Sequence, residues 1–206
     1  MTEVRPASPH DLEALYRIAL LTGDHGGDAS RLYEDPRLVG HIYAAPYAVL
    51  SPQTAFVAED AQGVAGYIVG ALDTRAFEAQ LERDWWPALR ARYNDPSDQP
   101  PSTWTPDQMR AWLIHHPYPT PDRVLTGHPS HLHINLLPRL QGQGMGKALM
   151  DRLLTDLAGS GSPGVHLGTS LANARARRFY ELYGFRTVER PARARSETVW
   201  MQYRLR

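Results

Sequence analysis

A glycine-rich turn between a strand and a helix is the feature that most constrains this chain. The turn Gln141–Gly146 (Gln-Gly-Gln-Gly-Met-Gly) follows an apolar run at His131–Leu137 and opens a helix predicted over Gly144–Gly159. Glycines at alternate positions let the backbone approach an anion closely, and a helix N-terminus adds about half a positive charge. The turn therefore predicts a pyrophosphate-binding loop, with Lys147 as a further positive charge. From the turn alone, a tight strand–helix connection without a ligand stays the alternative.

The hydrophobic periodicity around this turn predicts a mixed α/β sheet within a single domain, residues 1–206. Strands are expected at Val4–Ala7, Thr54–Glu59, Val64–Leu72, His131–Leu137, Val165–Thr169, Phe185–Val188 and Thr198–Leu205. Helices are expected at Ser8–Gly23, Asp35–Tyr43, Arg75–Leu89, Thr105–His115, Gly144–Gly159 and Asn173–Tyr183. Pro87 should kink or break its helix. The stretch of about 73–127 is a helical insertion between two strands that should be neighbours.

Composition excludes several classes of function. The chain has no cysteine, which removes disulfides, thiolate nucleophiles and cysteine-based zinc sites. Lys+Arg and Asp+Glu both total 22, so no nucleic-acid partner is expected. The arginine-rich stretches Arg175–Arg178 and Arg190–Arg195 are interpreted as solvated faces or cofactor contacts. No signal-peptide core and no apolar run near the ~20 residues of a membrane span is found, so we expect a cytoplasmic protein that does not bind membranes.

Two motifs resemble the GNAT superfamily of N-acetyltransferases. Gln141, Gly144 and Gly146 match the family pattern Gln/Arg-x-x-Gly-x-Gly/Ala. Asn173–Phe185 is similar to its Asn-x-x-Ala-x-x-Phe-Tyr-x-x-x-Gly-Phe segment. The resemblance implies the GNAT fold, a mixed, mostly antiparallel central sheet flanked by helices. It also implies direct acetyl transfer from acetyl-CoA to an amine, with no covalent enzyme intermediate.

A narrower resemblance rests on shorter strings. Gly26–Ser30, Leu38–Tyr43 and Gly66–Ile68 look like the acetyltransferase-like domain that ends animal O-GlcNAcase proteins. That relative is widely regarded as catalytically doubtful, whereas the phosphate loop looks intact here. The insertion of about 73–127 departs from the usual GNAT pattern, in which far less chain joins the two strands.

The family resemblance assigns most of the site. Leu136 and Leu137 lie where the family's strand splays open, and their backbone should bind the pantetheine arm. The implied cofactor-binding set is Leu136, Leu137, Gln141, Gly142, Gln143, Gly144, Met145, Gly146, Lys147, Asn173 and Tyr180. Asn173 either caps its helix or binds the pantetheine arm, or does both. By the same resemblance Tyr180 is the acid for the leaving thiolate, and Phe179 and Tyr183 are core residues. The alternative is that Tyr180 is also a core aromatic.

Three residues are candidates for the general base. His131 and His133 alternate on one face of the strand before the loop, and the pair is similar to the histidines of arylalkylamine N-acetyltransferases. An imidazole with an ordinary pKa near 6.5 suits proton transfer. Asp73, at the end of the preceding strand, is the rival base, and structural histidines are the alternative. No metal is expected, because no third ligand stands near the two histidines.

The acceptor cannot be read from the sequence beyond an amine on a small molecule or a protein lysine. A non-catalytic acetyl-CoA-binding module is the second hypothesis. A nucleotide-binding protein is the third, and it lacks the Gly-Lys-Ser/Thr end of a Walker A motif. The insertion contains four tryptophans: Trp85, Trp86, Trp104 and Trp112. We expect them either to line the acceptor side of the cofactor site or to form the surface of a homodimer or of a partner interface.

Overall fold

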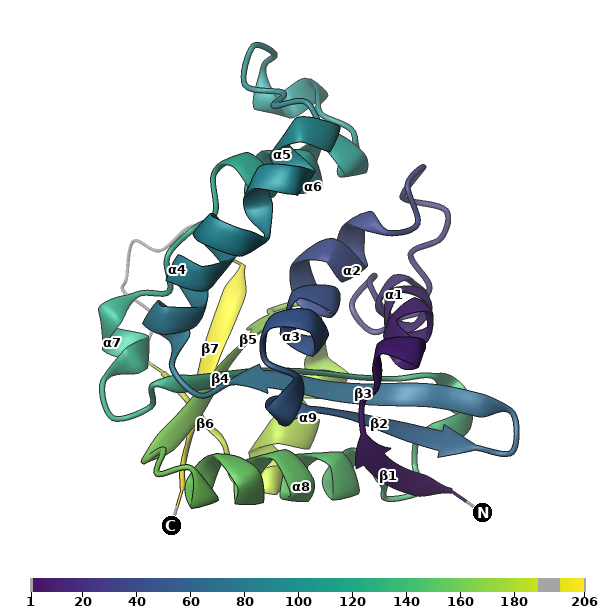
Figure 1. The fold of residues 1–206 in the computed structure, drawn as a ribbon, viewed down its shortest axis with the longest axis vertical. Helices are drawn as coiled ribbons and strands as arrows, with labels where there is room; N and C mark the ends of the chain where they lie inside the picture. Colours follow the sequence, from purple (N-terminus) through teal and green to yellow (C-terminus); the bar gives the residue numbers. More distant parts are fainter. Residues whose placement is uncertain (1, 189–196, 206) are drawn as a thin grey trace.

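The computed structural model describes residues 2–188 and 197–205. The predicted arginine stretch Arg190–Arg195 lies outside these described residues. A seven-stranded sheet in the order β1-β2-β3-β4-β5-β7-β6 crosses the molecule (Figure 1). Its strands are β1 (Glu3–Pro6), β2 (Ala55–Asp60), β3 (Gly63–Ala71), β4 (Ser130–Leu136), β5 (Gly164–Ser170), β6 (Arg186–Thr187) and β7 (Thr198–Arg204). Every neighbouring pair is antiparallel except β4 and β5, so the predicted mixed, mostly antiparallel sheet is confirmed.

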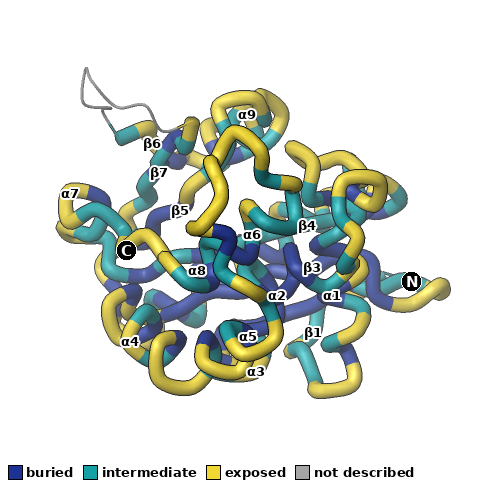
Figure 2. Tube along the Cα trace, turned by 90° about the horizontal axis from the view of Figure 1, so that it is seen from above, coloured by how far each residue is buried: buried dark blue, intermediate teal, exposed yellow. Residues whose placement is uncertain are grey.

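Helices cover both faces of the sheet. They are α1 (Leu12–Leu21), α2 (Leu38–Tyr43), α3 (Ala45–Leu50), α4 (Thr74–Asp84), α5 (Trp86–Arg92), α6 (Pro106–His115), α7 (Asp122–Leu125), α8 (Met145–Gly159) and α9 (Ala174–Tyr183). In Figure 1, α8 and α9 lie below the sheet, α1 to α3 lie above it, and α4 to α6 form an arm that rises away from it. Figure 2 shows the strands as the buried centre, with exposed loops around them.

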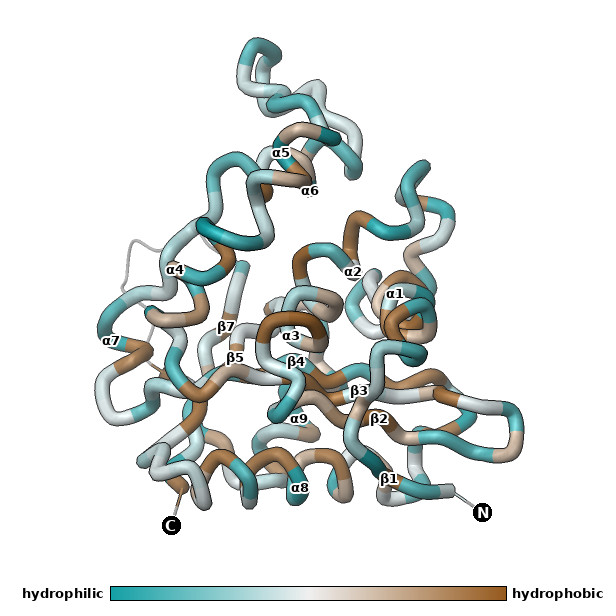
Figure 3. The backbone as a smooth tube through the Cα atoms, in the orientation of Figure 1, coloured by the Kyte–Doolittle hydropathy of each residue, from teal (hydrophilic) through white to brown (hydrophobic). Residues whose placement is uncertain are grey.

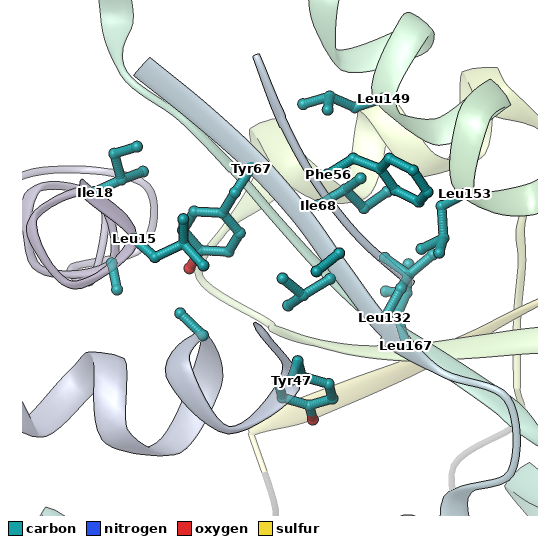
Figure 4. Close-up of a cluster of buried hydrophobic side chains, with 14 of the residues drawn as sticks. Leu15, Ile18, Tyr47, Phe56, Tyr67, Ile68, Leu132, Leu149, Leu153 and Leu167 are labelled. Carbon is teal, nitrogen blue, oxygen red and sulfur yellow. The ribbon is translucent and has the colours of Figure 1, made fainter. Parts of the chain in front are cut away.

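The core consists of two apolar layers that follow the alternation of the strands. Phe56 and Ile68 pack against Leu149 and Leu153 of α8, whereas Tyr67 points to the other face, toward α1 (Figure 4). The hydropathy view agrees, because the apolar segments gather in the strands and the inner helices while the connection between α5 and α6 is polar (Figure 3). The two layers fix the sheet and therefore the strand ends that form the site.

The parallel pair opens into a gap. β4 and β5 pair at only two positions, Ser130 with Val165 and His131 with His166. Beyond that point β4 stays paired with β3 up to Leu136, while β5 stays paired with β7. Among residues 2–188 and 197–205, the edges of β4 and β5 that face each other therefore have no strand partner there, as the resemblance had implied for the region around Leu136.

The helical insertion begins and ends at one place on the sheet. The backbone N–H of Thr74 donates to the carbonyl of Pro129 over 2.9 Å, which joins the chain leaving β3 to the chain entering β4. The predicted break at Pro87 is confirmed, because α4 ends at Asp84 and Pro87 lies in the first turn of α5. Pro46 also lies in the first turn of a helix, α3. This helix was not predicted, because a proline can either follow the end of one helix or lie in the first turn of the next. The return segment 117–129 contains the short α7.

Candidate active site

One large cleft of about 2250 Å³ runs from the gap between β4 and β5 toward the helical arm. Its lining includes residues 132–136 of β4 and 166–170 of β5, the glycine-rich loop, and parts of α4, α6 and α9. Pockets for small ligands are usually about 300–1,000 Å³, so this cleft has room for a cofactor and an acceptor together. Most of the predicted site residues lie on this one surface.

The glycine-rich loop has the geometry that an anion needs. Gly142 and Gly144 have φ angles of +72° and +79°, which residues with a side chain rarely adopt. A Cβ added at either position would meet nothing within 4 Å, so the space beside this backbone is open. Among the described residues, the N–H groups of residues 142–147 have no backbone acceptor, and they lie at the start of α8. These unpaired donors and the helix dipole together form an anion site.

The other loop residues shape the turn. The side chain of Gln141 donates to the carbonyl of Leu136 over 2.7 Å, and Gln143 donates to the carbonyl of Arg139 over 2.7 Å. Gly146 has a different role from the other glycines, because a Cβ there would meet the ring of Phe179 at 3.3 Å and force α8 away from α9. Lys147 lines the cleft, although its ammonium pairs with Asp151 over 2.6 Å.

Leu136 and Leu137 differ in what their backbone offers. The N–H of Leu137 donates to the carbonyl of Ala65 over 2.7 Å, and Leu137 is not among the residues that line the cleft. Because successive amides of a strand point to opposite edges, the amide of Leu136 faces the gap. The Leu137 amide is already bonded to β3, so of the two residues only Leu136 remains an expected contact of the pantetheine arm.

Helix α9 brings Tyr180 and Asn173 to the cleft. Tyr180 is 7% exposed, and within the described chain its hydroxyl has no hydrogen-bond partner. Burial raises the pKa of this hydroxyl, so it stays protonated as a donor. The Asn173 side chain accepts from the N–H of Ala176 over 3.0 Å and also lines the cleft, so the predicted cap is confirmed.

Burial along α9 differs from the expectation in degree. Phe179 and Tyr183, predicted to be core residues, pack against the core but are only partly buried. The hydroxyl of Tyr183 donates to Asp151 over 2.7 Å and so joins α9 to α8 near the surface. Tyr180 is the more buried residue, and the rings of Tyr180 and Tyr183 both lie near Phe185, at 5.7 and 6.1 Å.

A chain of hydrogen bonds joins the two histidines of β4. The hydroxyl of Thr74 donates to the carbonyl of Pro129 over 2.7 Å and lies 2.8 Å from Nδ1 of His131. The hydroxyl of Tyr47 lies 2.9 Å from Nε2 of His131 and 3.1 Å from Nε2 of His133. Thr74 is the first residue of α4, and Tyr47 lies within α3. Both residues are far from the two histidines in the sequence, so the sequence alone did not predict this arrangement.

The directions of these bonds determine both tautomers. Because the single proton of Thr74 goes to a carbonyl, its oxygen must accept from Nδ1–H of His131. Nε2 of neutral His131 then accepts from Tyr47, and the oxygen of Tyr47 accepts from Nε2–H of His133. Burial lowers the pKa of His133 to about 4 and that of His131 well below its ordinary value, so both rings are neutral near pH 7. Nδ1 of His133 is therefore unprotonated, and within the described chain it has neither a partner nor a complete covering of protein atoms.

Two other residues bear on the assignment of the base. His166 lines the cleft, and its Nδ1 donates to the carbonyl of His128 over 2.8 Å, which leaves Nε2 unprotonated. The position of His166 in a strand beside the predicted opening was a signal that could have added it to the candidates. Asp73, in contrast, is exposed and outside the cleft lining, and its carboxylate accepts from the N–H of Ala76 over 2.8 Å as the cap of α4. Asp73 is therefore corrected from a candidate base to a helix cap.

The insertion contributes one wall of the cleft. Phe77 and Leu81 of α4, Trp86 of α5 and Arg110 of α6 all line it. Trp85 does not, because its indole donates to the carbonyl of a residue in α2. The rings of Trp104 and Trp112 are tilted against each other, with their centres 5.9 Å apart, and neither residue is part of the lining. Of the four tryptophans, only Trp86 therefore lines the cleft. Within residues 2–188 and 197–205, we find no cluster of three metal-ligating side chains and no helix long and apolar enough to cross a bilayer.

Comparisons with known proteins agree with this geometry. The crystal structure of SsHAT is 35% identical and superposes with a TM-score of 0.88, covering 100% of this chain and 98% of that one. The structure of yncA from Salmonella typhimurium, solved with its cofactor acetyl-CoA, superposes with a TM-score of 0.56 at 18% identity, covering 100% and 94% of the two chains. The likeness to yncA shows a shared fold.

A curated relative is similar over most of this chain. Protein O-GlcNAcase of Rattus norvegicus is 25% identical over 183 residues, which are 88% of this chain and 20% of that protein. This chain thus spans about a fifth of the length of that relative. The model of the acetyltransferase (GNAT) family matches residues 4–185. A sheet that opens between β4 and β5, a glycine-rich loop at the start of α8 and a family match over most of its length together show that the chain belongs to the GNAT family of acetyltransferases.

Proposed function

We propose that this chain transfers the acetyl group of acetyl-CoA directly to the amine of a small molecule or a protein lysine. The observation that carries the proposal is the shared cleft, in which unpaired loop amides and the unprotonated Nδ1 of His133 both face the same space. The whole chain is proposed to act as a single domain.

The residues of the cleft fit acetyl-CoA. The amides of residues 142–147 would hold the pyrophosphate, and the free edge of β4 at Leu136 would bind the pantetheine arm. When bound, acetyl-CoA supplies a thioester whose carbonyl carbon an amine can attack. The absence of cysteine agrees with direct transfer, because it leaves no thiolate to carry an acyl group.

Proton transfer is assigned to two side chains. Nδ1 of His133 accepts a proton from the amine nitrogen as its bond to the carbonyl carbon forms, when that nitrogen becomes strongly acidic. A lowered pKa suits this late transfer and keeps the base unprotonated across the neutral range. The Tyr180 hydroxyl donates a hydrogen bond to the leaving sulfur, since its raised pKa keeps the proton on the oxygen. His166 is the alternative base, through its Nε2.

The direct test incubates the protein with acetyl-CoA and a library of amines and detects acetylated products by mass spectrometry. We expect one class of amine to be acetylated, and His133→Gln to reduce the rate strongly while acetyl-CoA still raises the melting temperature. If His166→Gln abolishes turnover and His133→Gln does not, the base is His166.

Acetyl-CoA binding without turnover is the second candidate function. The lowered pKa of His133 favours it, because such an imidazole is a weak base toward a free ammonium ion. A rise in melting temperature with acetyl-CoA, combined with no acetylated product from any amine, would support the binding module and refute the enzyme.

A further inference from the structure

Arg110 of α6 is a cation of the cleft whose charge no side chain of the described residues neutralises. Its guanidinium lines the cleft and is half-buried. Nε donates to the hydroxyl of Tyr33 over 2.9 Å, and Nη1 donates to the hydroxyl of Tyr43 over 3.2 Å. Both partners are neutral phenols. Within the described residues no carboxylate forms an ion pair with Arg110, and Nη2 donates to no protein atom.

The acidic residues of the insertion that line the cleft, Glu78 and Glu82, already have partners. Glu78 pairs with Arg75 and accepts from the N–H of Thr120 over 2.8 Å. Glu82 accepts two hydrogen bonds from Arg90, at 2.8 and 2.9 Å. A half-buried charge that has lost part of its hydration and gained no counter-ion is costly. A ligand anion in the cleft would offset that cost.

Tyr43 would take part in the same site. Its hydroxyl accepts from Arg110, so it still has its own proton to donate, and Tyr43 lines the cleft. The guanidinium and the phenol thus offer donors that converge on one region of the wall. Arginine forms paired hydrogen bonds to the two oxygens of a carboxylate, and these are among the stronger hydrogen bonds in proteins.

We propose that Arg110 and Tyr43 bind a carboxylate on the acceptor, so that the acetylated substrate is an amine that also carries a carboxylate. This inference rests on the proposed acetyl transfer and names its substrate class. One uncompensated cation matches a monoanion. A phosphate monoester, with about −1.5 to −2 charges near pH 7, would be only partly neutralised there.

The distance from Arg110 to the base fits such a molecule. The guanidinium carbon of Arg110 lies 5.5 Å from the ring centre of Tyr43, and that ring centre lies 5.5 Å from the ring centre of His133. The cation and the imidazole therefore cannot be farther apart than the sum of these two distances. An amine at Nδ1 of His133 and a carboxylate at Arg110 can belong to one small molecule.

The competing explanation is structural. Arg110 also lies over the rings of Tyr33 and Tyr43, at 5.9 and 5.5 Å, so it holds α6 against α2 and the loop before it. That role needs a cation, but it needs no ligand and predicts no preference among acceptors.

The test compares matched ligands on the full chain saturated with CoA, which keeps the cleft occupied without turnover. The probes are ω-amino acids from glycine to 8-aminooctanoate, and lysine, each beside its primary amide. Isothermal titration and acetylation rates from acetyl-CoA are measured for both members of each pair. A charge-assisted pair contributes about 1.5–3 kcal/mol, so the best carboxylate should bind about 10- to 150-fold more tightly than its amide.

Variants separate the two explanations. Arg110→Gln should reduce the preference for the carboxylate to less than about threefold. Tyr43→Phe, which keeps the ring under the guanidinium, should reduce it in part. Arg83→Gln removes the same charge from an exposed arginine of the arm that pairs with Asp84, and it should leave the preference unchanged. If Arg110→Gln unfolds the protein, Arg110→Lys and Tyr43→Phe carry the test.

The outcomes are distinguishable from failure of acetyl transfer. Preferential binding of a carboxylate that depends on Arg110, with no acetylated product, supports this site and refutes the proposed enzyme. Acetylation of amines with equal binding of every acid and its amide overturns this site and leaves the enzyme. A preference that survives Arg110→Gln also overturns it.

Discussion

Replacing Tyr47 by phenylalanine should lower turnover through the tautomer of His133. Tyr47 is 5% exposed and its ring stacks on Phe77 at 4.5 Å, so phenylalanine keeps the packing and removes only the hydroxyl. That hydroxyl connects Nε2 of His131 to Nε2 of His133. Without it, His133 is free to place its proton on Nδ1, where it can no longer accept a proton from the amine.

The magnitude follows from the single bond that holds the tautomer. A buried hydrogen bond contributes about 1 kcal/mol net, which is about a fivefold bias between two tautomers. Losing that bias lowers the population of the active tautomer by up to about fivefold, so we expect kcat to fall by up to about fivefold, with the affinity for acetyl-CoA unchanged. Stability should also fall, because two imidazole nitrogens lose their partner at about 1–3 kcal/mol each. Thiol release from acetyl-CoA measures the rate, and ¹⁵N NMR of the imidazoles reports the tautomers directly.

Tyr16→Phe is the matched control. The hydroxyl of Tyr16 lies 2.9 Å from Nδ1 of His41, and the pair is buried outside the cleft lining. The control therefore removes a tyrosine–histidine bond of the same kind and should reduce stability without changing kcat. If Tyr47→Phe loses no more activity than Tyr16→Phe, or if the Nε2–H signal of His133 persists unchanged in ¹⁵N NMR, the tautomer argument is wrong.

Three further predictions concern the cofactor site, the proposed donor and acid stability. Gly144→Glu should abolish the rise in melting temperature with acetyl-CoA, because it fills the anion site with a negative side chain; Gly161→Glu, also at positive φ but away from the cleft, should retain that rise. Tyr180→Phe should lower kcat up to about 10²-fold with little change in acetyl-CoA affinity, and an unchanged rate would limit Tyr180 to packing. Burial holds the pKa values of His131 and His133 below the unfolded value near 6.5, so acid favours the unfolded state. The free energy of unfolding should thus fall by up to about 1.4 kcal/mol per pH unit for each histidine as the pH is lowered from about 6.5 to 4. Urea titrations measure this free energy, and a value that does not change with pH over this range would contradict the prediction.

The sequence predicted the features whose chemistry is local. Gly142 and Gly144 predicted the turn before α8, where both adopt a positive φ, and the helix predicted over Asn173–Tyr183 ends at Gly184, which also has a positive φ. The family motifs fixed the order of β4, α8, β5 and α9. Pro87 predicted the break between α4 and α5, which is also a local effect. Proline has no backbone N–H to donate to the preceding turn of a helix.

The unpredicted part of the site depends on tertiary contacts. Tyr47 lies 84 residues before His131 in the chain, and no periodicity connects the two. The sequence around Arg110 does not distinguish it from a solvent-exposed arginine of an amphipathic helix. The fold shows that its hydrogen-bond partners are phenols rather than carboxylates. The degree of burial along α9 was missed for a related reason, because the helical spacing of Phe179 and Tyr183 does not show how far the core covers them.

The junction of the insertion with the sheet also controls the proposed base, which leads to a prediction for Thr74. Thr74→Val removes the hydroxyl that fixes Nδ1–H of His131, while the backbone bond from residue 74 to Pro129 remains and keeps the insertion closed. His131 can then carry its proton on Nε2 and donate to Tyr47.

That change reverses every bond of the chain. Tyr47 would donate to Nε2 of His133, and His133 would hold its proton on Nδ1, facing the cleft. Thr74→Val should therefore reduce kcat by about the same factor as Tyr47→Phe, although it lies two residues farther from the base along the chain of bonds. Thr74→Ser keeps the hydroxyl and should restore the rate and the Nε2–H signal of His133 in ¹⁵N NMR. A valine variant that keeps this signal and the full rate would show that the tautomers are set elsewhere.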